Sequence, residues 1–118
     1  MLRSLSYAAY AGLINYTARR AEDFEKLEPW ARLWERSTAA EFLRAYRETA
    51  SNSTFLPPDE GDLRGLLSVH WLDKVFYELA YELNNRPGWA RIPLMGILSL
   101  PIEARGREWN STLFRNRL

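Results

Sequence analysis

The chain of 118 residues has the length of one domain, and its 47% hydrophobic and 26% charged residues are typical of a globular protein, not a disordered one. The formal net charge is +1, and acidic and basic residues alternate throughout, which argues against a nucleic-acid or anionic-membrane surface. Without cysteine, disulfides, thiolate catalysis and cysteine-ligated metals are excluded. No signal peptide is recognisable and no apolar run reaches the roughly 20 residues of a spanning helix, so we expect a soluble, cytoplasmic protein that binds no membrane.

The first segment has apolar residues at spacings of three and four, which predicts a helix with one apolar face. These residues are Leu2, Leu5, Ala9, Leu13 and Tyr16. No Ser, Thr, Asp or Asn stands where a helix cap is usual, so we interpret the first helix as lying inside a larger fold.

A second helix is expected after the charged residues 19–26, with Pro29 in its first turn. Trp30 and Trp34 lie on one of its faces, and Ala39, Phe42, Leu43 and Tyr46 lie on the other. A helix that buries two faces in turn needs two partners or a bend. The two tryptophans could form a binding platform, but we expect them to fill the gap between two helices.

Polar turn formers and two prolines in residues 51–58 predict a loop. A third helix should run from about residue 59 to residue 84 and end at 85–88, where proline and glycine follow. Pro93 can open a short fourth helix through residue 98, and nothing indicates a strand. We therefore predict an all-α domain over residues 1–98, with a loosely ordered polar tail over 99–118.

The third helix carries two stripes. Its apolar stripe, expected to be core, comprises Leu72, Phe76, Leu79 and Leu83. The opposite stripe combines rings with hydrogen-bonding groups: His70, Lys74, Tyr77, Tyr81 and Asn85. A sugar offers C–H faces rimmed by hydroxyls, and tyrosine meets both. The alternative is that this helix packs on both sides, so that its tyrosines are ordinary core residues and His70 is a structural histidine.

Complete catalytic or metal-binding sets are not found. There is no glycine-rich phosphate loop, and the single histidine has no companions at ligand spacing. Acidic pairs such as Glu22-Asp23 are typical of solvated helix starts. We therefore assign no catalytic residue, no metal ligand and no cofactor to this chain.

A family resemblance starts from residues 72–87 and 89–94, and residues 1–9, 27–30 and 42–47 fit it as well. These segments resemble the C-terminal end of the maltokinases, which are often fused behind a trehalose synthase (maltose α-D-glucosyltransferase) domain. The resemblance covers about residues 1–98, and its most specific part is residues 81–87. The tail after Ser99 has no counterpart.

Maltokinases are transferases of α-glucan metabolism that use ATP and Mg²⁺ to convert maltose to maltose 1-phosphate. Their fold resembles the aminoglycoside phosphotransferases, so the resemblance implies an all-α section of a kinase-like C-lobe. The family's His-x-Asp catalytic loop and magnesium-binding acidic segment lie upstream of the matching region, and neither is present here. His70 is followed by Trp71-Leu72, so it cannot be the histidine of that loop. Phosphoryl transfer depends on such positioning and metal-assisted groups, so we expect the chain to be inactive alone.

The resemblance also implies a site. Tyr77 and Tyr81 match acceptor-sugar contacts, with Lys74, Asn85 and Arg86 as neighbours or supports. The implied partners are maltose and either the missing N-terminal part of the kinase or a fused trehalose synthase domain. The alternative is a free-standing helical interaction module without a sugar site.

Overall fold

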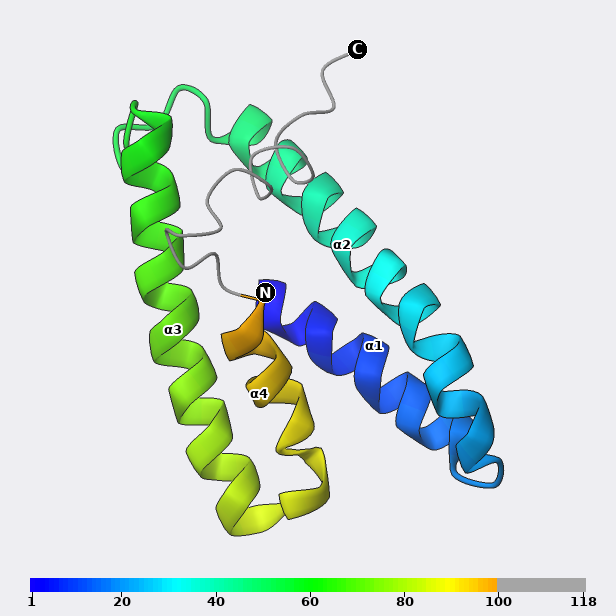
Figure 1. Ribbon diagram of the computed structural model, residues 1–118. Helices are drawn as coiled ribbons and strands as arrows, with labels where there is room; N and C mark the ends of the chain where they lie inside the picture. The colour runs from blue at the N-terminus through cyan, green and yellow to red at the C-terminus, as the bar shows by residue number, and fades with distance from the viewer. Residues whose placement is uncertain (100–118) are drawn as a thin grey trace. The chain divides into compact units, whose positions relative to one another are not determined.

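The structure is a computed structural model that describes residues 1–99, and its regular elements in that range are all helical, with no strand (Figure 1). The predicted all-α class is therefore confirmed. The chain divides into two compact units, one from Met1 to Arg44 and one that begins at Ala45. The predicted tail lies outside the described residues except for Ser99, which caps the last helix. Within residues 1–99 no helix combines the length and apolarity that crossing a membrane requires.

The first unit contains α1 (Leu2–Thr17), the short 3₁₀ helix η1 (Ala21–Asp23) and most of α2 (Phe24–Thr49). As expected, Met1 precedes α1 without a side-chain cap. The buried face of α1 differs from the predicted apolar stripe, because it includes three polar side chains while Tyr16 is 75% exposed. It consists of Arg3, Ser6, Ala9, Tyr10, Leu13 and Thr17.

Polar side chains join α1 to α2. The Ser6 hydroxyl donates a hydrogen bond to the Glu35 carboxylate. The Tyr10 hydroxyl donates to Oε1 of Glu28 at 3.2 Å and accepts from Nε of Arg32 at 3.1 Å. Partner numbers fall along α2 as they rise along α1, so the two helices are antiparallel (Figure 1).

The second helix begins earlier than predicted. Residues 21–23 already form η1, and α2 follows at Phe24, so Pro29 lies in the second turn and not the first. The helix runs without a break to Thr49, although Pro29 has no N–H to donate to the Glu25 carbonyl. One lost intrahelical hydrogen bond is therefore tolerated here.

The predicted packing of the tryptophans is wrong for the described residues: Trp30 is 69% exposed and Trp34 48% exposed, and α2 has no buried residue at all. The side chains that reach α1, namely Glu28, Arg32 and Glu35, recur at spacings of four and three and so share one face. The tryptophans lie on the other side of the helix, at about 100° per residue. The expectation that α2 buries two faces is also wrong within residues 1–99, because α2 has no buried residue.

The second unit contains the end of α2, then α3 (Glu60–Asn85), the 3₁₀ helix η2 (Pro87–Trp89) and α4 (Arg91–Leu98). Residues 51–58 form the predicted loop. Asp59 caps α3, since its side chain accepts from the backbone N–H groups of Gly61 and Asp62 at 2.8 and 3.0 Å. Arg86 leaves helical geometry with φ −145°, and Gly88 keeps a negative φ within η2.

α3 packs against η2 and α4, which lie beside it in Figure 1. Nε1 of Trp71 donates a 3.0 Å hydrogen bond to the Gly96 carbonyl, which places Trp71 on the packing face. Three buried residues share that face at helical spacing: Val75, Glu78 and Glu82. α4 contributes Ile92, Pro93 and Gly96 to the core.

The predicted core stripe of α3 is therefore wrong for the described part of the chain. Phe76 is 56% exposed and Leu83 is 57% exposed, whereas Leu72 and Leu79 are half-buried. Val69 lies two turns before Phe76 on the same side of α3, and it is 64% exposed. The packing face is rotated by about one residue from this stripe, since Val75 and Glu82 take the buried positions beside Phe76 and Leu83.

Candidate functional site

The candidate site is the stripe of rings and polar groups along α3, whose members are all exposed. Tyr77 is 64% exposed and Tyr81 is 47% exposed. The other members, equally on the surface, are His70, Lys74 and Asn85. Neither tyrosine lies in the core of residues 1–99, so both rings are accessible to a ligand in this part of the chain.

Each of these tyrosines carries a cation over its ring. Nζ of Lys74 lies 4.7 Å from the ring centroid of Tyr77, three residues along the helix. Cζ of Arg86 lies 5.6 Å from the ring centroid of Tyr81, five residues along the chain. Both distances are within the range of attraction between a cation and an aromatic ring, which is worth about 0.5–1 kcal/mol at exposed sites.

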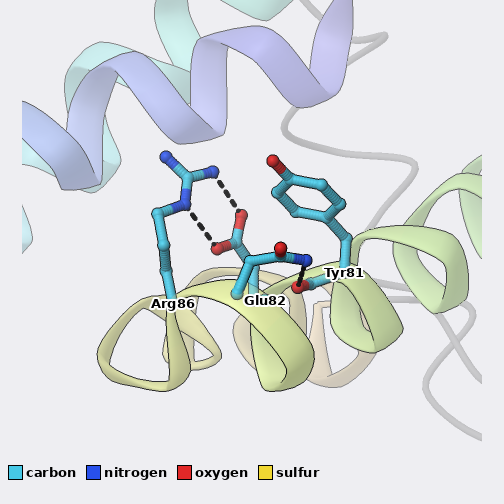
Figure 2. Close-up of polar contacts among 4 residues, drawn as sticks. Tyr81, Glu82 and Arg86 are labelled. Carbon is cyan, nitrogen blue, oxygen red and sulfur yellow. Dashed lines mark hydrogen bonds and ion pairs between the residues drawn. The ribbon is translucent and has the colours of Figure 1, made fainter.

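Arg86 is anchored by a buried carboxylate. Its Nε and Nη2 donate to Oε2 and Oε1 of Glu82 at 3.0 and 2.8 Å, a two-point pairing that Figure 2 shows beside the ring of Tyr81. Glu82 is 1% exposed, while the Arg86 side chain is 46% exposed. The same guanidinium lies 4.4 Å from the ring centroid of Trp89 in η2.

The two asparagines at the end of α3 bond to its last turns. Nδ2 of Asn85 donates to the Tyr81 carbonyl at 2.8 Å, and Nδ2 of Asn84 donates to the Ala80 carbonyl at 2.7 Å. The amide oxygen and the second N–H of Nδ2 are then the groups that Asn85 would offer to a ligand. Asn85 is thus placed beside Tyr81 by a bond to that residue's own backbone.

Two residues of this arrangement, Glu82 and Trp89, were missed from the sequence, whereas Arg86 was predicted. Glu82 and Arg86 have opposite charges four residues apart, with the acid first, a spacing that favours an ion pair and could have indicated it. Nothing in the pattern indicated Trp89, because its position depends on the turn that Pro87 and Gly88 make after α3.

The chemistry that these groups support is binding. Tyrosine rings offer apolar contact, their hydroxyls donate and accept, and Lys74 and Asn85 add polar groups nearby. Among residues 1–99 no three His, Cys, Asp or Glu side chains are grouped so as to hold a metal ion. No protein-family model matches the chain, and no solved structure matches it at a significant level.

Proposed function

We propose that this chain is the C-terminal helical section of a kinase-like C-lobe in a maltokinase-type sugar kinase, and that it contributes part of the acceptor-sugar site. The complete enzyme would use ATP and Mg²⁺ to convert maltose to maltose 1-phosphate. The observation that carries the proposal is the exposure of Tyr77 and Tyr81 on one helix, in the segment whose sequence resembles that family.

The ring geometry supports a sugar ligand. Tyr77 and Tyr81 are four residues apart and so lie one turn apart on the same side of α3. A pyranose can contact one ring through its C–H groups and hydrogen-bond to the neighbouring hydroxyl. A disaccharide is long enough to contact both tyrosines.

The exposed apolar residues of α3 support the first part of the proposal, that the chain is a section of a larger lobe and packs against more protein. Val69, Phe76 and Leu83 are each more than half exposed and lie at spacings of seven residues, which makes one apolar stripe. Apolar surface of this kind marks interaction sites. The upstream part of the kinase, or a fused trehalose synthase domain, would cover it.

The test is a maltose titration of the purified 118-residue chain, followed through its backbone amide NMR signals. We expect millimolar binding, with shifts concentrated around Tyr77 and Tyr81, and loss of the shifts in a Tyr77→Ala/Tyr81→Ala variant. Tyr16→Ala is the matched control, since Tyr16 is also an exposed tyrosine, at 75%, but lies on α1. Uniform small shifts that persist in the double variant would contradict the sugar site.

A second assay addresses activity. The chain alone, given ATP, Mg²⁺ and maltose, should form no maltose 1-phosphate, because the catalytic loop expected upstream is missing. Activity should appear when the chain is joined to an upstream segment that carries a His-x-Asp loop. Activity of the chain alone that survives repurification would overturn this part of the proposal.

The second candidate, a helical interaction module without a sugar site, is favoured by the exposed residues of α2. Trp30, Leu33 and Trp34 are 69%, 54% and 48% exposed on one side of that helix. The reading frame upstream of the gene separates the candidates: a His-x-Asp loop there favours the kinase, and its absence favours the module.

A further inference from the structure

The pairing of Glu82 with Arg86 joins a buried carboxylate to a partly exposed guanidinium at the end of α3. Arginine stays charged at any ordinary pH, and its planar fork matches a carboxylate at two points. Both of those points are occupied here, at 3.0 and 2.8 Å. Because Glu82 is 1% exposed, it cannot itself touch a ligand in solvent.

The pairing restricts where the guanidinium can lie. Lysine at this position would keep the charge but lose the two-point geometry. With Arg86 anchored, its Cζ lies 5.6 Å from the Tyr81 ring centroid and 4.4 Å from the Trp89 ring centroid. These two rings come from different elements, α3 and η2, so one cation connects the end of the helix to the turn that follows.

The cation of the neighbouring tyrosine differs. Lys74 lies over Tyr77 at 4.7 Å, but its ammonium is a point charge on a flexible stem, and the residue is exposed. Of the two tyrosines, Tyr81 is therefore the one whose neighbouring cation, Arg86, is held by a buried carboxylate, that of Glu82.

We propose that Arg86 is a positioning residue, held by the buried Glu82, that fixes the ring of Tyr81 and does not itself bind the sugar. This inference rests on the proposed function for the role of Tyr81 as a sugar contact. The positioning of the Tyr81 ring by Arg86 and Glu82 does not depend on that role, and it can be tested without any sugar.

The experiment uses the full 118-residue chain and three variants: Arg86→Lys, Glu82→Gln and, as matched control, Arg36→Lys at an exposed arginine of α2. The first readout is NMR of the arginine ε-protons and of the Tyr81 ring. In the unchanged chain the Arg86 ε-proton should exchange with water at least about tenfold more slowly than that of Arg36, because it is bonded to a buried carboxylate. Contacts between the Arg86 side chain and the Tyr81 ring should be detectable in the same spectra.

Both Arg86→Lys and Glu82→Gln should move the Tyr81 ring signals, and Arg36→Lys should not. If Glu82→Gln unfolds the chain, Arg86→Lys still carries the test, because it keeps the positive charge next to Glu82. Tyr81 ring signals that are unchanged in a folded Arg86→Lys chain would overturn the positioning role.

The second readout is the maltose titration. Arg86→Lys should weaken maltose binding by about three- to tenfold, the equivalent of one hydrogen bond lost through a misplaced hydroxyl, with Arg36→Lys unchanged. If the ring signals move but the unchanged chain binds no maltose, the positioning stands and the proposed function fails. If maltose binds and Arg86→Lys leaves both readouts unchanged, the proposed function stands and the positioning fails.

Discussion

The indole Nε1 of Trp71 donates a 3.0 Å hydrogen bond to the carbonyl oxygen of Gly96, and this bond joins α3 to α4 across 25 residues of chain. Replacing Trp71 by Phe keeps a ring but removes the donor, so the free energy of unfolding should fall by about 0.5–1.5 kcal/mol. Thermal unfolding followed by circular dichroism measures it. Ser99→Ala is the control, because it removes the other side-chain donor to the same carbonyl without touching the contact between α3 and α4. Equal effects of the two variants would contradict the bridging role of Trp71.

Tyr10 makes the stability of the first unit sensitive to alkaline pH. Burial raises the pKa of Tyr10 above its usual value, and the nearby Arg32 opposes part of that rise. Since the pKa is higher in the folded than in the unfolded chain, the contribution of Tyr10 is complete below about pH 10, where the unfolded phenol titrates, and is lost as pH rises beyond it.

Tyr10→Phe tests this directly. At pH 7 it should lower the free energy of unfolding by about 1–3 kcal/mol, because Glu28 and Arg32 lose the hydroxyl they share in a part-buried site. The difference between the two proteins, measured by urea unfolding, should shrink between pH 9 and pH 11. A difference that stays constant over that range would contradict the raised pKa.

The Asp59 cap should contribute measurably to α3. Asp59→Ala removes the acceptor of two backbone N–H groups and should cost about 0.5–2 kcal/mol in urea unfolding, whereas Asp59→Asn keeps an acceptor and should cost less. Gly61 provides a cross-check, since a Cβ there would meet Oδ1 of Asp59 at 2.9 Å. Gly61→Ala should therefore give its full stabilisation of about 1 kcal/mol only when Asp59 is already Ala. Additive effects of the two changes would contradict the close contact.

Tyr81→Phe separates ring contact from hydrogen bonding in a complete kinase that carries this segment. The ring remains and the hydroxyl is lost, so the KM for maltose should rise by a few-fold to about tenfold while the KM for ATP changes little. Steady-state kinetics with each substrate varied in turn measures both. Tyr16→Phe, at another exposed tyrosine, serves as the control. An unchanged maltose KM would remove Tyr81 from the list of sugar contacts.

The exposed face of α2 should drive self-association of the isolated chain. Trp30→Gln combined with Leu33→Gln should shift the mass measured by sedimentation equilibrium towards the monomer. Its effect on unfolding should stay within about 0.5 kcal/mol, since neither residue is buried. Phe55→Gln, at a 67% exposed loop residue, is the control. A chain that is already monomeric at high concentration would contradict the prediction.

The positions of the helices could be predicted from the sequence much better than the faces that these helices bury. Helical spacing and the prolines and glycines between helices located the four α-helices of residues 1–99 to within a few residues, apart from the early start of α2 at Phe24. Those signals are local, and they act through backbone geometry. The buried faces depend on partners from other elements, and here the partners of α1 are the polar side chains of α2.

The candidate site shows the same division. The stripe of Tyr77 and Tyr81 follows from helix geometry, and the structure places both on the surface as that geometry allows. The link from Arg86 to Trp89 depends on where η2 goes after the helix, and no periodic pattern contains that information.

The polar pairing of α1 with α2 also determines the alignment of those two helices. An apolar seam can slide by a turn and still exclude water, since dispersion contacts are not directional. The Ser6–Glu35 bond and the two bonds of Tyr10 are directional, and all three would break together if one helix moved by a turn. The antiparallel pair of α1 and α2 therefore has a single energetically favoured register. The tryptophans on the outer side of α2 can contact other surfaces without disturbing the contact with α1.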